Sequence, residues 1–186
     1  MDGSVTLAPT LKTTLSSADY PRSLNLGSGN RPIAGHLNVD CSARVNPDLV
    51  LDLNARPWKL PENYFSLVRM HDVAEHLADL RATLDEIHRI GQNGAKVDIS
   101  VPHFSSANAF ADPDHRYFFA HNSLNFCAEP QQKNKFTIDS VTIHFERYFG
   151  ARLARWYANR HPAWYEKRWA WTFPANFLSY QLTVVK

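Results

Sequence analysis

The sequence is poor in the features that mark several common classes of protein. Only two of its 186 residues are cysteine, Cys41 and Cys127, and their spacing fits neither a metal motif nor a disulfide framework, which favours a reducing cytoplasm. A formal net charge of +2 is too small to predict a nucleic-acid partner. No apolar run approaches the roughly 18 residues of a membrane span, and no basic region precedes an apolar run near the start. We therefore expect neither a signal peptide nor stable membrane insertion.

The remaining composition is that of an ordinary globular protein. Apolar residues make up 44% and charged residues 20% of the chain, and its length is enough to bury a substantial core. The first part is polar and rich in serine and threonine. We predict a flexible N-terminal arm over residues 1–22 and a single domain over residues 23–186.

A short buried strand that runs into a glycine-rich turn is the most informative motif. The stretch Ser23–Asn30 reads Ser-Leu-Asn-Leu-Gly-Ser-Gly-Asn, and its two leucines alternate with polar residues as a strand requires. Gly27 and Gly29 let the backbone turn sharply and bring its N–H groups close to a ligand. A second apolar strand ends in Asp40, whose carboxylate could accept hydrogen bonds from two ribose hydroxyls. Together they predict a nucleoside site at the carboxyl edge of a parallel sheet.

A dinucleotide-binding fingerprint is the first alternative for this motif. It requires a third glycine three residues after the second, and an acidic residue about 20 residues further on. Here the third position is Pro32 and Asp40 comes much sooner, so an NAD-linked oxidoreductase is disfavoured. Pro32 and Gly35 also leave hardly any room for a helix before the second strand. We therefore predict a shortened first crossover, formed by a loop or a single turn.

The rest of the chain alternates strands with helical or loop segments, which predicts a mostly parallel α/β sheet. The run at 48–53 is almost continuously apolar, as in a parallel strand covered on both faces. A helix is predicted over 72–89, with one apolar stripe, and a turn over 91–94. Further strands are predicted at 65–71, 96–101, 136–143 and 181–185, and a helical, basic and aromatic segment at 147–171, interrupted by Pro162.

These motifs, in this order, resemble class I S-adenosylmethionine-dependent methyltransferases, most closely a small bacterial branch of methyltransferase domains. The similar segments are Leu24–Gly29, Asn38–Asp40, Asp52–Asn54, Leu60–Val68, His71–Leu77 and Glu86–Ile90. The resemblance covers roughly residues 23–119 and departs from the family pattern at Ser66 and at 91–94. It implies a Rossmann-like sheet of seven strands with an antiparallel last strand.

The resemblance also implies that S-adenosylmethionine is the cofactor, lying across the ends of the first, second and fourth strands. Gly27 and Gly29 would lie beside its methionine part, and Asp40 would bind the ribose hydroxyls. Asp52 would flank the adenine, and His71 would lie near the methionine end. The full set of predicted cofactor-binding residues is Leu26, Gly27, Ser28, Gly29, Asp40, Asp52, Leu53, Asn54 and His71.

Candidate catalytic residues lie in the irregular segment after the fifth strand. Methyl transfer is an in-line displacement that depends mainly on alignment, but a hydroxyl or amine acceptor must also lose a proton. Histidine titrates near neutrality, so we take His115 as the first candidate base and His103 as the second. Either residue could instead only fix the loop through hydrogen bonds. Asp112 and Arg116 are candidate substrate contacts, although an ordinary salt bridge would explain Arg116 equally well.

A metal site is a further alternative. His103, Asp112 and His115 could supply two imidazoles and one carboxylate, but their spacing matches no known metal motif, and we predict no metal. His76, inside the predicted helix, is interpreted as a structural histidine.

We predict acceptor-side insertions at 103–135 and 147–175. Basic and aromatic residues intermingle between Arg152 and Trp171, which is compatible with a substrate lid, a membrane-surface contact, or ordinary core with a dimer contact. The predicted function is a cytoplasmic methyltransferase that acts on an oxygen or nitrogen of a small-molecule or saccharide acceptor. A homodimer is left open, and a non-catalytic module that binds S-adenosylmethionine is the alternative.

Overall fold

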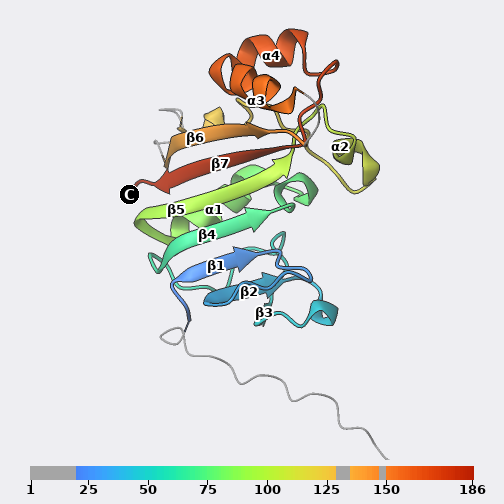
Figure 1. The fold of residues 1–186 in the computed structure, drawn as a ribbon. Helices are drawn as coiled ribbons and strands as arrows, with labels where there is room; N and C mark the ends of the chain where they lie inside the picture. Colours follow the sequence, from blue (N-terminus) through green and yellow to red (C-terminus); the bar gives the residue numbers. More distant parts are fainter. Residues whose placement is uncertain (1–19, 129–134, 147–149) are drawn as a thin grey trace, which may run out of the picture.

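The computed structural model describes residues 20–128, 135–146 and 150–186, and its centre is a seven-stranded sheet (Figure 1). The strand order is β3-β2-β1-β4-β5-β7-β6. The strands are β1 (Ser23–Leu26), β2 (His36–Asp40), β3 (Leu49–Val50), β4 (Phe65–His71), β5 (Gly91–Pro102), β6 (Phe136–His144) and β7 (Phe177–Val184). Neighbouring strands from β3 to β5 are parallel, whereas β7 is antiparallel to both β5 and β6. The predicted Rossmann-like, mostly parallel sheet with an antiparallel last strand is confirmed. Up to residue 19, the predicted N-terminal arm lies outside the described residues.

The first crossover contains no helix, as predicted, and residues 27–35 form a loop between β1 and β2. The loop is fixed by two buried amide side chains on neighbouring strands. Asn25 Nδ2 donates to Asn38 Oδ1 at 3.0 Å, and the same oxygen accepts the Ile33 N–H at 2.7 Å. These contacts hold the loop in place without a crossover helix.

The helix after β4 starts later than predicted. α1 spans Leu80–Ile90, and the residues before it form the 3₁₀ turn η3 (Ala74–His76). Asp72 has a left-handed φ of +55°, which no helix accommodates, so the predicted start at residue 72 is wrong. The helix is capped instead by Asp79, whose side chain accepts the Ala82 N–H at 3.0 Å.

Two strand assignments also need correction. β3 is only two residues long and lies at the edge of the sheet, where Val50 is 54% exposed, so the strand predicted over 48–53 is too long and is not covered on both faces. The predicted turn at 91–94 is instead the start of β5. There the register against β4 shifts between Phe65 and Leu67, and Gly94 has a φ of +79°. The glycines therefore serve an irregular strand.

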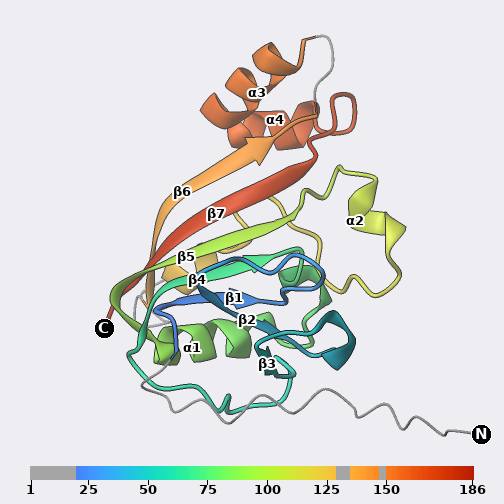
Figure 2. The same cartoon turned by 60° about the horizontal axis from the view of Figure 1, so that its bottom comes forward.

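The two faces of the sheet differ in chemistry. Apolar residues of β1, β4, β5 and β7 are buried on the face that α1 covers (Figures 1 and 2). On the opposite face, alternate residues of β4, β5 and β7 are polar and half-buried: Arg69, His71, Asp98, Ser100, Ser179 and Gln181. No helix of the described ranges lies over that face, which Figure 1 shows from the front.

The later helices follow β5 and β6, toward the edge of the sheet that is opposite to β2 and β3. α2 (Asn108–Ala111) and η4 (Asn125–Ala128) belong to the segment after β5, while α3 (Ala151–Arg160) and α4 (Pro162–Arg168) lie next to β6 (Figure 2). Asn159 fastens α3 to β6, since its side chain bonds both the N–H and the carbonyl of Ile143. Pro162 opens α4, as the predicted interruption requires. No helix in the described part of the chain has the length and apolar character needed to cross a membrane.

Candidate functional site

The carboxyl ends of β1 and β2 bring the predicted nucleoside motif together. The Ser28 N–H donates to the Val39 carbonyl at 2.9 Å, which ties the turn after β1 to β2. The Asp40 carboxylate accepts the N–H groups of Gly29 and Ser42, each at 2.8 Å. Asp40 is half-buried, so its two oxygens are held in a fixed direction while lone pairs stay available for further donors.

The two glycines of the turn are required for different reasons. Gly27 has a φ of +65°, and a Cβ placed on it would lie 2.2 Å from Cγ2 of Val73. Gly29 has a φ of +49°, but a Cβ there would meet no atom within 4 Å. Gly27 thus allows the turn to pack against the segment that follows β4, whereas Gly29 is needed only for its backbone conformation.

The residues predicted to flank adenine divide into exposed and buried groups. The Asp52 side chain is exposed and accepts the Asn54 N–H at 2.8 Å, and Asn54 Oδ1 in turn accepts the Ala78 N–H at 2.8 Å. Leu53 is buried, and its carbonyl accepts the Trp58 indole N–H at 3.2 Å. Leu26 and Ser28 are buried as well, so their cofactor-binding role, like that of Leu53, stays a prediction.

The end of β4 carries a charged network that sequence reasoning missed. His71 Nε2 and Arg69 Nε lie 3.1 and 3.4 Å from Asp98 Oδ2, and Gln181 Nε2 donates to Asp98 Oδ1 at 2.7 Å. Burial raises the pKa of Asp98, but its hydrogen bonds and the neighbouring charges outweigh burial and hold that pKa below its usual value. The alternation of polar and apolar residues along β5 and β7 could have indicated this network, because such alternation is typical of strands with one uncovered face.

This network borders a polar hollow of about 570 Å³ on the uncovered face of the sheet. Next to it, Asp72 forms an ion pair with Arg31 at 2.9 Å. The hollow is lined by Arg31, His71, Asp72, Asp98, Ser100, Pro102, Asn108, Asn176, Phe177, Ser179 and Gln181.

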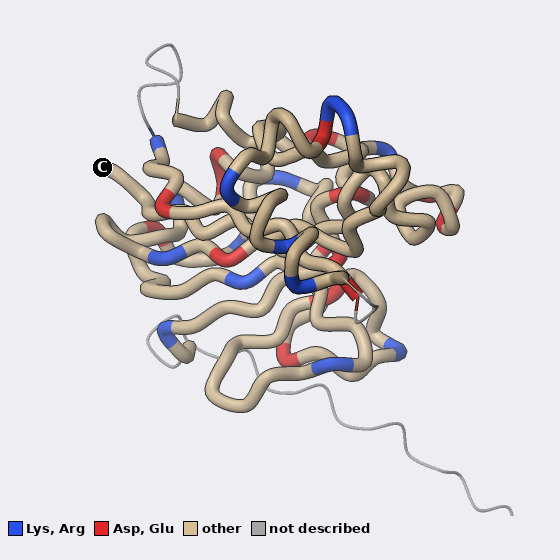
Figure 3. Tube along the Cα trace, turned by 45° about the horizontal axis from the view of Figure 1, so that its top comes forward, with Lys and Arg blue, Asp and Glu red and all other residues tan. Residues whose placement is uncertain are grey.

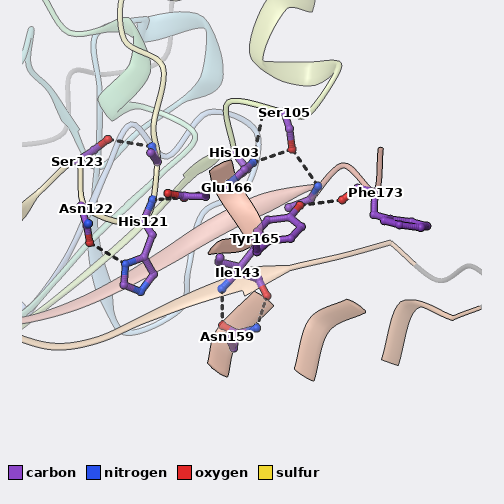
Figure 4. A network of polar contacts seen from close by, with 12 residues as sticks. His103, Ser105, His121, Asn122, Ser123, Ile143, Asn159, Tyr165, Glu166 and Phe173 are labelled. Atoms are coloured by element: carbon purple, nitrogen blue, oxygen red, sulfur yellow. Dashed lines mark hydrogen bonds and ion pairs between the residues drawn. The ribbon is translucent and has the colours of Figure 1, made fainter. Parts of the chain in front are cut away.

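The structure places His103 inside a polar network (Figure 4). Its side chain is fully buried, and its Nδ1 accepts the Ser105 N–H at 3.1 Å. The ring proton is therefore on Nε2, which faces Glu166 Oε1 of α4 at 3.4 Å. Glu166 also accepts the His121 N–H. Both ring nitrogens are engaged, an arrangement that favours the alternative in which His103 fixes the segment after β5.

His115 has a different environment. It is half-buried, and its Nδ1 donates to the Ala109 carbonyl at 2.9 Å, which leaves the lone pair of Nε2 free in the neutral ring. Its ring lies against that of His76, with centroids 4.6 Å apart and planes at 67°. Glu75, next to His76, is 1% exposed, and burial raises the pKa of its carboxyl to about 7. The structure thus groups His115 with Glu75 and His76.

The two candidate substrate residues lie on the surface of the segment that carries His115. Asp112 and Arg116 are exposed, and Asp112 Oδ1 accepts the Asp114 N–H at 2.9 Å in a local turn. The Arg116 N–H donates to the Glu75 carbonyl at 2.7 Å. In the view of Figure 3 acidic and basic positions are interspersed along the chain.

The mostly parallel, Rossmann-like sheet with one antiparallel strand is similar in fold to solved SAM-dependent methyltransferases. A SAM-dependent methyltransferase from Archaeoglobus fulgidus is 16% identical with a TM-score of 0.61, over 89% of this chain and 86% of that chain. One from Mesorhizobium loti is 13% identical with a TM-score of 0.57, over 91% and 93%. Phosphoethanolamine N-methyltransferase 2 from Haemonchus contortus, in complex with S-adenosyl-L-methionine, is 18% identical with a TM-score of 0.56, over 89% of this chain and 49% of that chain. No protein-family model and no curated protein matches the sequence.

Proposed function

We propose that this protein is a methyltransferase that uses S-adenosylmethionine and methylates an oxygen or nitrogen of a small polar acceptor. The observation that carries the proposal is the Asp40 carboxylate, oriented by two backbone N–H groups beside the turn at Gly27 and Gly29. It lies at the carboxyl edge of a parallel sheet, where open α/β folds bind their ligands. The fold shared with solved SAM-dependent methyltransferases supports the same assignment.

The residues present fit the cofactor. Asp40 would accept hydrogen bonds from the ribose hydroxyls, and the exposed Asp52 would accept one from the adenine amino group. The backbone at Gly27 and Gly29 would face the methionine part, with His71 at the same end. When bound, the cofactor supplies a methyl group activated on a sulfonium. The task of the protein is then to align the acceptor and to take its proton.

The polar hollow beside His71 and Asp72 is the proposed acceptor pocket. Its lining offers hydrogen-bond donors and acceptors of both charges, which suits a hydroxyl-rich acceptor such as a saccharide. The aromatic helices α3 and α4 lie beside β6, far from β1 and β2 in the strand order, so they support an acceptor site less well. His115, with its free Nε2, remains the proposed base, and Asp112 and Arg116 remain proposed acceptor contacts.

Calorimetric titration with S-adenosylmethionine, S-adenosylhomocysteine and NAD tests the cofactor assignment. We expect micromolar binding of the first two and none of NAD. Asp40→Ala should weaken binding by more than about 100-fold, because two charge-assisted hydrogen bonds are lost. Asp85→Ala is the matched control, since that aspartate is exposed on α1 and its ion pair among the described residues is with Lys135. Unchanged affinity in a folded Asp40→Ala variant would refute the site.

A further inference from the structure

Three potential metal ligands converge from two segments of the chain. Glu75 and His76 belong to η3, directly after β4, and His115 lies in the segment after α2. One ligand atom from each side chain lies within 4.8 Å of the other two. The backbone fixes the arrangement, because the N–H groups of Arg116 and Tyr117 both donate to the Glu75 carbonyl, at 2.7 and 3.3 Å. The two segments that carry the three side chains are therefore joined by backbone hydrogen bonds.

Glu75 gives an independent reason to expect a cation. The residue is 1% exposed, and its Oε2 has no hydrogen-bond partner among the described residues. Leaving a buried polar group unsatisfied costs roughly 1–3 kcal/mol, and more when the group is charged. A cation bound at Oε2 would remove that cost.

The two histidines are prepared for the same role. Because Nδ1 of His115 donates to the Ala109 carbonyl, the Nε2 lone pair is available, which is the usual second-shell arrangement of a metal-ligating histidine. The ring of His76 lies against that of His115, with centroids 4.6 Å apart.

We propose that Glu75, His76 and His115 bind one divalent transition-metal ion, with zinc as the preferred ion and at least one coordination position open. Two imidazoles and one carboxylate favour zinc or iron over magnesium or calcium. Zinc–ligand distances near 2.0–2.1 Å put tetrahedral ligand atoms about 3.4 Å apart, so ligand atoms that now lie within 4.8 Å of one another must draw closer by at most about 1.4 Å. Side-chain rotation of the half-buried His76 and His115 can supply this movement.

This trio differs from the one considered from the sequence. His103, which is fully buried and bonded at both ring nitrogens, is not part of it, and neither is Asp112. The proposal that a metal binds here depends only on these three residues and not on the proposed function. Only its role, to hold an acceptor oxygen next to the cofactor, rests on the proposed function. A metal ion bound at Nε2 would use the lone pair of His115, so His115 is the proposed base of the metal-free protein, and in the metal-bound protein the ion itself would acidify the acceptor hydroxyl.

The test is metal titration of the full-length, tag-free protein after treatment with a chelator. Zn²⁺ is followed by competition with a chromophoric chelator, and Co²⁺ by its visible absorption. We expect one equivalent per chain with micromolar or tighter affinity. Glu75→Gln and His115→Ala should each lower the affinity by more than about 100-fold, since loss of a ligand costs more than loss of a second-shell partner. His121→Ala, which removes a half-buried histidine outside the trio, should bind as the wild type does.

Absence of saturable binding by the wild type, or unchanged affinity in folded Glu75→Gln and His115→Ala variants, would overturn the proposal. Near-ultraviolet circular dichroism establishes that the variants are folded, and Glu75→Gln keeps the shape of the buried side chain. Cofactor binding is measured on the same samples. Metal binding without cofactor binding would support this site and refute the proposed function. Cofactor binding without metal binding would support the proposed function and refute this site.

Discussion

The ends of β1 and β2 and the ends of β4 and β5 form two halves of one sheet edge, but they are built differently. In the first half, Gly29, Asp40 and Ser42 come from one short stretch and are joined by backbone donors. In the second half, Glu75 meets His115, and His103 meets Glu166, across long separations in sequence. The first half is therefore specified by local pattern, and the second by tertiary contacts. The following experiments measure how much stability depends on local contacts and how much on contacts between distant segments.

The largest effect is expected from Gly27→Ala, where the two halves touch. A left-handed φ costs about 1–2 kcal/mol for alanine. The collision with Val73, at 2.2 Å, adds about 1–3 kcal/mol of overpacking, so we expect a loss near 3 kcal/mol in the free energy of unfolding. Gly29→Ala, with open space around its Cβ, should lose only about 1 kcal/mol. Urea denaturation of both variants measures the difference, and equal losses would contradict the described packing.

The second largest effect is expected in the pH dependence of the free energy of unfolding, through Glu75 in the metal-free protein. Its pKa is about 7 when folded, against 4.5 for an ordinary glutamate, so the folded state holds the proton more tightly. The stabilisation is complete below about pH 4.5 and is lost as the pH rises through 7. The shift corresponds to about 3 kcal/mol. Urea denaturation with chelator at about pH 5 and about pH 8 should show this loss in the wild type and not in Glu75→Gln. Parallel pH profiles for the two proteins would count against the unpaired carboxyl.

The difference between the two halves also explains which parts of the fold and of the candidate site could be predicted from the sequence. The strand-end position of Asp40 and the loop crossover at Pro32 and Gly35 follow from neighbouring residues, and the structure agrees with both. Glu75 and His76 could not be recognised as part of a cluster, because the apolar stripe around them was interpreted as helix. The left-handed backbone of Asp72 and the turn at η3 depend on contacts with distant residues. Local pattern contains no information about such contacts.

The edge of the sheet gives a second example. The apolar run at 48–53 predicted a strand covered on both faces, yet β3 has only β2 as a neighbour, and Val50 is exposed. Hydrophobic content indicates that a strand exists, but its place in the sheet order is fixed by pairing. In contrast, the alternation in β5 and β7 would have indicated an uncovered face and so would have led to Asp98 and Gln181.

An intermediate effect is expected in the network around His103. Glu166→Ala removes the acceptor of the His121 N–H and leaves the buried His103 Nε2–H facing no partner. Loss of such contacts should cost about 2 kcal/mol. Glu166→Gln keeps an acceptor oxygen and should recover most of that loss, and the midpoint of urea denaturation reports both. A Gln variant as unstable as the Ala variant would show that charge, rather than hydrogen bonding, holds this half together.

The smallest effect tests where α1 begins, which the sequence pattern placed too early. Asp79 caps the helix by accepting the Ala82 N–H, so Asp79→Ala should lower the free energy of unfolding by about 1 kcal/mol. Asp85→Ala removes an exposed carboxylate from the same helix and a surface pair with Lys135, which should cost only a few tenths of a kcal/mol. If the helix instead began at residue 72, Asp79 would lie in its interior and the two variants would be equally stable. A clear gap between their denaturation midpoints therefore supports the later start, and with it the 3₁₀ turn that positions Glu75 and His76.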